Sequence, residues 1–441
     1  MIQALKIQEG TSKYSFKFWL MMAIFYALFF VRNVVGFSFP VILYLAWIGV
    51  MMLTFDELEI KALLVSFIPL YPAFQYKYAL MLCIAIYIIR FFRQAKIALV
   101  IFPGIFLMVW ELLHHNIGIF SFWDYVRNFI EILCIMTIVC IVPKKQGDAC
   151  QLSRVLGLSS VVAFSILLIT TLQTRQITIF ELIESSFRLG NLNEELTEFK
   201  FVYNANGLGY LCNLAIGGLL INFYHKKGNI LDALMIAFAL FIGLLTTSRT
   251  FILVMLFTLA IYVLLQNSTV WKKIRTVSVI FFFSVVGILL VYLIFPDIIL
   301  NYISRFTAED VTGGRGYLLE YYNDFVFSSP ERMFFGIGMQ DIAGKVKLLE
   351  NVIVLVPHNG YQEILVAWGL VGFVLMAFFM VGIFVHARKR NRSKKIVWIH
   401  YLPLLLLLIN ILAGQFVSSF RKLSLVFIYE VIASYTNYED A

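Results

Sequence analysis

Long apolar runs alternate with short polar segments along most of the chain. A helix of about 20 mostly apolar residues crosses a bilayer, and somewhat shorter ones also occur. The pattern predicts spans at residues 16–34, 37–54, 60–74, 77–92, 97–113, 122–143, 154–172, 204–223, 229–247, 250–266, 276–296, 360–385, 396–414 and 418–435. Segment 60–74 is short and carries Pro69 and Pro72, so it is either a kinked span or a re-entrant hairpin. The expected fold is an all-α polytopic membrane protein with about 12–14 transmembrane helices, forming a single integral membrane domain over residues 1–441.

Short basic loops predict the orientation of these spans. If the spans alternate, the basic loops all fall on one side of the membrane: 90–96, 144–145, 226–227, 272–275 and 388–395. That side is cytoplasmic by the positive-inside rule, and both termini then lie there too.

Two long segments, 173–203 and 297–359, are placed by this topology on the external side. The second has eight acidic against five basic residues, so an anionic ligand there needs specific arginines rather than a diffuse positive field. Within it, apolar and aromatic residues alternate with charges over 314–327. This predicts an amphipathic helix that lies along the membrane surface or caps a cavity and ends at Pro330. Gly336-Ile337-Gly338 is expected to form a flexible turn beyond it.

Composition agrees with a membrane protein: 61% of residues are hydrophobic, 14% are charged, and the mean hydropathy is +0.87. A soluble domain is about half apolar and a quarter charged. The net charge of +9 lies mostly in short tracts beside apolar runs, which indicates topology and lipid contact. No nucleic-acid partner is expected, because no basic tract is interleaved with stacking aromatics. The five cysteines form no CxxC pair or metal-ligand spacing, so we expect no disulfide framework, metal or cofactor.

Several polar residues fall on the predicted external side, where ionisable groups are costly unless they serve a function. Arg249 lies in a tight connection between two spans, and Arg315 lies among glycines in the second long loop. His358 lies at the end of that loop, and Asn204 and Asn206 open the span that follows the first long loop.

The chemistry of these groups is mutually consistent. A guanidinium binds phosphate oxygens in bidentate fashion and stays charged, so two of them suit a diphosphate. A neutral histidine has a pKa close to the working pH and can take a proton from a hydroxyl. Together they suit a site where an alcohol attacks a carbon that bears a diphosphate leaving group.

Each residue also has a structural interpretation. Arg249 could anchor a helix end in the lipid headgroups, although it lies on the side that the basic loops avoid. Arg315 could form an ion pair with an acid of its own loop. Asparagine is a good helix cap, so Asn359 could start its span, and Asn206 is expected to cap the span that follows it.

Two further polar groups are expected to be structural. The pair His114-His115 has no acidic or cysteine partner nearby, which predicts ordinary loop polarity. Asp124 and Glu131 have helical spacing to Arg127, so they are expected to pair with it.

The ordered set of motifs resembles the Wzy_C/O-antigen ligase superfamily, which comprises Wzy-type polysaccharide polymerases and WaaL-type ligases. The resemblance covers residues 200–375, and the N-terminal half matches only as a hydrophobic scaffold. The pieces that carry it are Asn204-Ala-Asn206-Gly207, Thr247-Ser248-Arg249, Gly314-Arg315, Gly336-Ile337-Gly338, and Pro357-His358-Asn359 followed by Gly369 and Gly372.

The resemblance implies a GT-C-type, inverting, metal-independent glycosyltransferase whose donor is a glycan on undecaprenyl diphosphate. By this analogy His358 activates the acceptor hydroxyl, and Arg249 and Arg315 hold the diphosphate as it leaves. Asn206 and Asn359 are secondary substrate-binding residues.

The acceptor distinguishes the two activities that the resemblance implies. A polymerase uses another lipid-linked repeat unit and makes O-antigen, capsule or exopolysaccharide, whereas a ligase uses lipid A-core. The breadth of the family favours a polymerase, and a membrane transporter is a further alternative. The expected location is a bacterial plasma (inner) membrane with the active site on its periplasmic or external face. The expected partners are the lipid-linked oligosaccharide, the bilayer and a chain-length regulator.

Overall fold

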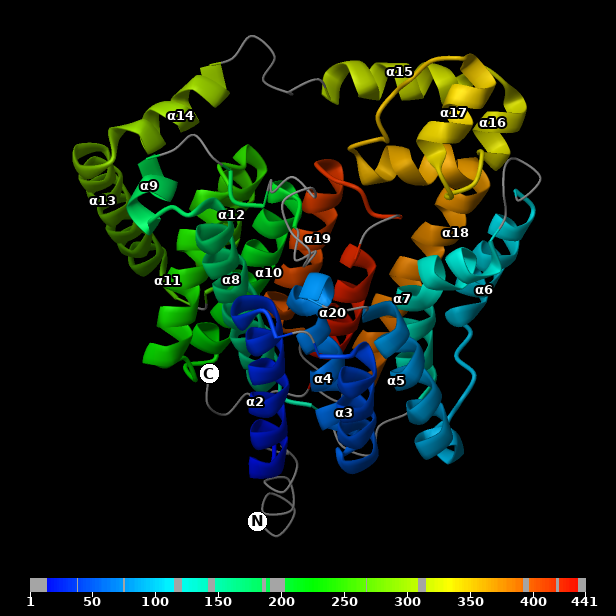
Figure 1. The fold of residues 1–441 in the computed structure, drawn as a ribbon, viewed down its shortest axis with the longest axis horizontal. Helices are drawn as coiled ribbons and strands as arrows, with labels where there is room; N and C mark the ends of the chain where they lie inside the picture. Colours follow the sequence, from blue (N-terminus) through cyan, green and yellow to red (C-terminus); the bar gives the residue numbers. More distant parts are fainter. Residues whose placement is uncertain are drawn as a thin grey trace.

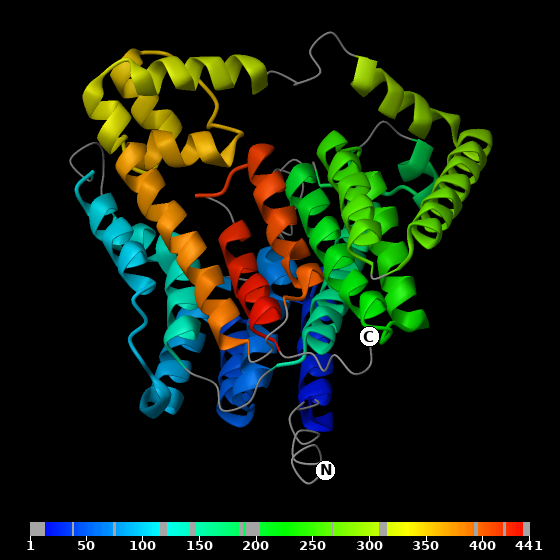
Figure 2. The same ribbon diagram turned by 180° about the vertical axis from the view of Figure 1, so that it is seen from behind.

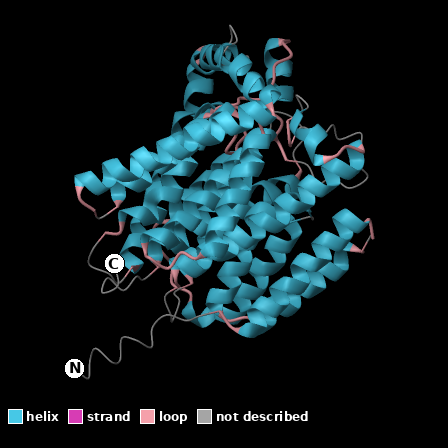
Figure 3. Cartoon of the chain, turned by 90° about the vertical axis from the view of Figure 1, so that its left-hand side faces the viewer, coloured by secondary structure: helices cyan, strands magenta, loops and turns pink. Residues whose placement is uncertain are grey.

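The structure is a bundle of helices that stand roughly parallel, with further helices lying across one end (Figures 1 and 2). This computed structural model describes residues 14–37, 39–73, 76–114, 121–141, 147–184, 188–190, 203–266, 268–307, 315–391, 396–417 and 420–434. Figure 3 shows no strand within these ranges, where the only extended pairing is the isolated bridge between Ala95 and Ile141. The described chain is therefore all-α, as expected.

The N-terminal half contributes helices on both sides of the bundle in Figure 1. Ser15, Asp56, Ser121 and Asp148 cap four of them with their side chains. The helices are α2 (Phe16–Phe30, extended by the π-helix η2, Val31–Val35), α3 (Val41–Thr54), α4 (Glu57–Leu70), η3 (Tyr71–Ala73), α5 (Tyr76–Phe91), η4 (Phe92–Gln94), α6 (Ile101–Leu112), α7 (Phe122–Cys140), α8 (Ala149–Arg175) and α9 (Ile179–Glu184).

The C-terminal half completes the bundle and supplies the helices across its upper end. Of these, α15, α16 and α17 lie above α18 and α6 in Figure 1, whereas α14 lies above α13. The helices are α10 (Ala205–Tyr224), α11 (Ile230–Leu245), α12 (Arg249–Leu265), α13 (Val270–Ile294), α14 (Pro296–Thr307), α15 (Arg315–Phe327), α16 (Pro330–Phe335), α17 (Ile342–Glu350), α18 (Gly360–Arg390), η6 (Trp398–Tyr401), α19 (Leu402–Leu412), η7 (Phe420–Leu423) and α20 (Ser424–Ala433).

Every predicted span coincides with one of these helices, and this confirms a polytopic membrane fold. Four helical segments of the described chain are long and apolar enough to cross a bilayer unaided: Phe16–Val35, Ala149–Arg175, Ala205–Tyr224 and Gly360–Arg390. The others are shorter or less apolar, so the number of crossings remains a prediction.

Two of the short helices, α4 and α20, occupy the middle of the bundle instead of facing lipid. Every residue of α4 is buried, and its Lys61 forms ion pairs with Glu430 of α20 at 2.9 Å and with Glu57 at 3.6 Å. Pro69 lies in the last turn of α4. With 14 residues α4 is about 21 Å long, against about 30 Å for a hydrocarbon core. Segment 60–74 is therefore a short, central helix.

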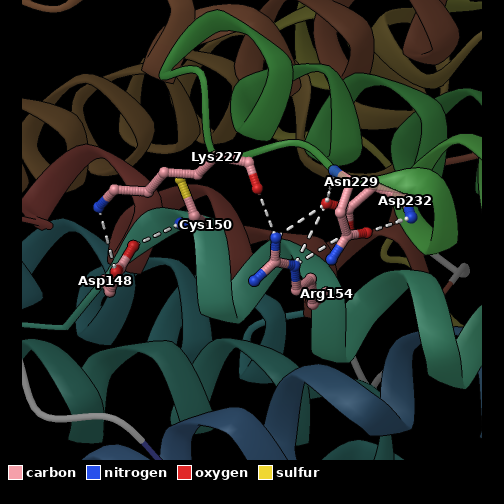
Figure 4. Close-up of polar contacts among 6 residues, drawn as sticks. All are labelled: Asp148, Cys150, Arg154, Lys227, Asn229 and Asp232. Carbon is pink, nitrogen blue, oxygen red and sulfur yellow. Dashed lines mark hydrogen bonds and ion pairs between the residues drawn. The ribbon is translucent and has the colours of Figure 1, made fainter. Parts of the chain in front are cut away.

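The ends of α8 and α11 that lie beside the basic Lys226-Lys227 pair are tied together by partly buried polar contacts (Figure 4). Arg154 of α8 binds Asp232 of α11 through Nε–Oδ1 and Nη2–Oδ2 contacts of 3.0 Å, and its Nη2 also donates to the carbonyl of Lys227. Asp232 is fully buried, so removing Arg154 would leave an unpaired buried charge and is expected to cost about 3–5 kcal/mol. At the same end Arg390 of α18 donates to the carbonyl of Ile141 at 2.8 Å. These contacts join the ends of α8 and α11, and of α7 and α18, from which predicted cytoplasmic loops leave.

The opposite, upper end holds the long 297–359 segment (Figure 1). The amphipathic helix expected over 314–327 is α15, which buries Leu318 and Tyr322. It already ends at Phe327, and Pro330 begins the next helix, α16, instead of ending α15.

Candidate functional site

The starts of α10 and α12 are joined by a hydrogen bond at the upper end of the bundle. Asn204 caps α10 by accepting from the backbone N–H of Asn206 at 2.9 Å, so the expectation that Asn206 is the cap was wrong. The Asn206 side chain instead accepts from Ser248 Oγ at 3.0 Å. Ser248 caps α12, and Arg249, partly exposed, is the first residue of that helix. Asn206 and Arg249 are therefore brought to one place.

A further arginine reaches the same turn from the 173–203 segment. Arg188 Nε donates to the carbonyl of Thr246 at 3.2 Å, and the N–H of Leu189 donates to the carbonyl of Leu245 at 3.0 Å. These contacts place Arg188 beside the connection that carries Arg249. Nothing in the sequence predicted this place for Arg188, because its neighbours form no motif.

The start of α18 places His358 at the same end. Asn359 caps this helix, accepting from the N–H groups of Tyr361 at 3.0 Å and Gln362 at 3.3 Å, which confirms its expected role as a cap. His358, partly exposed, precedes the cap directly. The helix breaks at Gly369, so its first two turns lie across the bundle and the remainder runs down through it (Figures 1 and 2).

Helix α15, which Arg315 begins, is fastened to these first turns of α18. Gln362 Nε2 donates to the carbonyl of Leu319 at 2.6 Å and to Asn323 Oδ1 at 3.1 Å. Both helices begin toward the middle of the molecule in Figures 1 and 2. Leu319 lies four residues beyond Arg315, and Gln362 lies four residues beyond His358. The two helix starts therefore lie side by side. The Arg315 side chain itself is outside the described part of the chain.

The glycine motif 336–338 is a fixed contact and not the flexible turn that was expected. The N–H groups of Ile337 and Gly338 donate to the carbonyls of Val366 and Ala367 at 2.9 and 2.7 Å. A Cβ added to Gly336 would lie 2.6 Å from the backbone of Ala367, and one added to Gly369 would lie 2.4 Å from the carbonyl of Phe334. These glycines let α16 approach the break in α18 closely.

His114 belongs to the same contact, so the expectation of loop polarity was wrong for this residue. It is buried, and its Nδ1 and Nε2 lie 2.9 Å and 2.7 Å from the carbonyl oxygens of Trp110 and Phe335. Burial is the main cause that lowers the pKa of its imidazole. Nearby, the buried Glu111 accepts from the N–H of Met339 and from Trp368 Nε1. His115 is outside the described residues.

Below the start of α18 lies a non-helical segment, residues 413–417, held by charged side chains. The buried Glu363 accepts from the N–H groups of Phe416 at 2.6 Å and Val417 at 2.8 Å. Lys422 donates to the carbonyl of Val417 and lies 3.6 Å from Glu131. Glu131 therefore pairs across the bundle instead of with Arg127, whereas the Asp124–Arg127 pair is confirmed.

The comparison with protein families matches one segment of this chain. Residues 234–377 match the model of the O-antigen ligase family, Wzy_C. Over this segment the chain is similar to the O-antigen ligase family. The Wzy_C segment covers about a third of the chain and runs from α11 into α18, which confirms the resemblance from residue 234 onward; the Asn204-Ala-Asn206-Gly207 motif lies outside the match. No curated protein matches the chain.

The Wzy_C segment contains Arg249, Arg315 and His358, and the structure places the helix starts that carry them at one end of the bundle. Asn206, outside the segment, is attached to it through Ser248. Within the described ranges no group of three or more His, Cys, Asp or Glu residues has a geometry suited to a metal ion. The chain thus contains a segment similar to the O-antigen ligase family within a helical membrane protein.

Proposed function

We propose that the protein is a bacterial surface-polysaccharide polymerase. It transfers a glycan from undecaprenyl diphosphate to a hydroxyl of another lipid-linked repeat unit, on the external face of the plasma membrane. One observation supports this most: the Wzy_C segment gathers the helix starts of Arg249, Arg315 and His358 at the end of the bundle opposite the basic loops. That end is external by the positive-inside rule.

In the proposed reaction the acceptor hydroxyl attacks the anomeric carbon from the side opposite the diphosphate. His358 takes the hydroxyl proton as the new carbon–oxygen bond forms. The bond from the anomeric carbon to the diphosphate oxygen breaks, and its electron pair leaves with the diphosphate. Arg249 and Arg315 stabilise the charge that develops on this leaving group. No metal is needed in this scheme, and attack from the opposite side inverts the configuration.

A ligase is the second candidate, because the matched family carries the description O-antigen ligase. It would use the same donor and the same three residues and differ only in its acceptor, lipid A-core. The two activities leave different glycans behind when the gene is lost, so one experiment separates them.

The test is complementation of a deletion strain with the wild type, Arg249→Ala, Arg315→Ala and His358→Ala. We expect each alanine variant to reach the membrane but to lose long-chain polysaccharide, with lipid-linked single repeats accumulating. Arg332→Ala is a matched control, since Arg332 lies at the same end but pairs with Glu350 at the surface. It is expected to retain long chains, as read from the glycan ladder on a gel.

Two other results would redirect the proposal. Long chains that accumulate on the lipid carrier, unattached to their final acceptor, would identify the ligase. Long chains made normally by all three alanine variants would contradict the proposed site itself.

A further inference from the structure

Arg421 is a buried arginine below the helix starts that form the proposed site. It belongs to η7, is only 5% exposed, and donates from Nη1 to the carbonyl of Gln415 at 2.5 Å. Its guanidinium carbon lies 5.4 Å from the ring centre of Tyr210. Arginine stays charged even where it is desolvated, so this position holds a permanent positive charge inside the bundle.

The depth of η7 makes this charge unusual. α19 and α20 have 11 and 10 residues, so each is about 15–17 Å long, roughly half of a hydrocarbon core. In Figure 1 the upper ends of α4 and α20 stop below those of α10, α12 and α19. The connection from α19 to α20 therefore descends into the protein. Ionisable groups at such depth mark substrate sites by default, because their burial is otherwise costly.

Arg421 also lies between the two halves of the site. On one side its ring partner Tyr210 is one helical turn beyond Asn206, and a Cβ on Gly207 would lie 3.5 Å from the neighbouring Phe420. On the other side, a Cβ added to Gly414 would lie 2.5 Å from Arg421 Nη2.

Gly414 in turn touches the helix that His358 precedes. A Cβ added to Gly360 would lie 3.0 Å from the carbonyl oxygen of Gly414 and 2.8 Å from Phe416 Cβ. A continuous set of contacts thus runs from the start of α10, through Arg421, to the start of α18.

We propose that Arg421 is a further substrate-binding residue, which holds the diphosphate of the lipid-linked donor from below. This inference rests on the proposed function and extends it. The segment 413–417, fixed by Glu363 and Lys422, keeps the guanidinium in place. Arg249 and Arg315 then bind the diphosphate from the upper end, and Arg421 binds it from the bundle interior.

The test measures binding of undecaprenyl diphosphate, with uncharged undecaprenol as the comparison, to the full-length protein in lipid nanodiscs. The wild type is expected to prefer the diphosphate. Arg421→Gln keeps a donor for the Gln415 carbonyl but removes the charge, so it is expected to weaken diphosphate binding by about tenfold or more. Undecaprenol binding stays unchanged. Arg421→Lys restores the charge without the fork and is expected to recover part of the affinity.

Gly414→Ala is a second variant that keeps the arginine. Its Cβ would displace the guanidinium, so it is expected to weaken diphosphate binding as well. Gly49→Ala is the matched control, since a Cβ there meets no atom within 4 Å. If Arg421→Gln loses the fold, as judged by size-exclusion elution, Gly414→Ala decides the question.

The outcomes separate this inference from the function on which it rests. Unchanged diphosphate affinity in the folded Arg421 and Gly414 variants, beside a wild type that prefers the diphosphate, overturns only the role of Arg421. A wild type with no preference for the diphosphate over undecaprenol overturns the proposed donor as well.

Discussion

At two helix starts, one polar residue caps the helix and a polar residue beside it leaves its side chain for another role. At α10, Asn204 satisfies the free N–H of the first turn, and Asn206 turns its side chain to Ser248. At α18, Asn359 caps the helix, and His358 stands just outside it. In both places the cap fixes the backbone that carries the neighbouring polar residue, which is what the proposed site requires of Asn206 and His358.

The two asparagines of α10 should therefore respond differently to substitution. Asn204→Ala removes an exposed cap and is expected to lower the free energy of unfolding by about 1 kcal/mol, with glycan synthesis retained. Asn206→Ala removes the bond to Ser248 beside Arg249 and is expected to reduce synthesis severalfold or more. Melting temperature and glycan ladders of the two variants check this, and the reverse pattern would contradict the assignment.

Which asparagine serves as the cap could not be read from the sequence. Both residues precede the same apolar run and both are good caps. The choice depends on backbone conformation: Asn204 is extended, with φ −70° and ψ 137°, and the helix begins at Ala205. The cap at Asn359 was predictable, because His358 is a poor competitor for that role.

At the scale of elements, the break in α18 organises the upper end. Gly369 adopts φ 63° and ψ −167°, a conformation that is essentially confined to glycine. The break turns the first two turns of α18 across the bundle, where they meet α15 through Gln362 and the 413–417 segment through Glu363. One residue thus sets the position of His358 relative to both neighbours.

Gly369→Ala is expected to weaken the contact between α16 and α18. The backbone strain alone is expected to cost about 1–3 kcal/mol. The Cβ would also meet the carbonyl of Phe334 at 2.4 Å, which pushes α16 away from α18. We expect a lower melting temperature and loss of glycan synthesis, whereas Gly49→Ala leaves both unchanged. Wild-type stability and synthesis in the Gly369 variant would show that the break does not position the site.

The positions of the helices along the chain were easier to predict than the contacts between helices. Each apolar run became a helix, because a backbone without water must satisfy its hydrogen bonds internally. The central place of α4 was not predictable: Lys61 and Glu430 are distant in sequence, and only tertiary packing joins them. For the same reason the burial of His114 was not predictable, because its partner Phe335 is distant in sequence.

At the scale of the whole molecule, polar contacts are divided between the two ends. One end holds the Arg154–Asp232 pair, and the other holds the starts of α10, α12, α15 and α18. Sequence predicts through the positive-inside rule that the first of these ends is cytoplasmic. It did not reveal that Arg421 and Lys422 are buried, because a basic pair at the start of an apolar run resembles a membrane-surface anchor.

The central claim is that this upper end transfers glycans from a lipid diphosphate. The most direct measurement uses the purified protein in proteoliposomes with an undecaprenyl-diphosphate-linked repeat unit, with products analysed by mass spectrometry. We predict glycans of two or more repeats and released undecaprenyl diphosphate from the wild type, and neither from His358→Ala. Movement of the unchanged repeat across the bilayer, with no joined product and no effect of His358→Ala, would contradict the account and indicate a transporter.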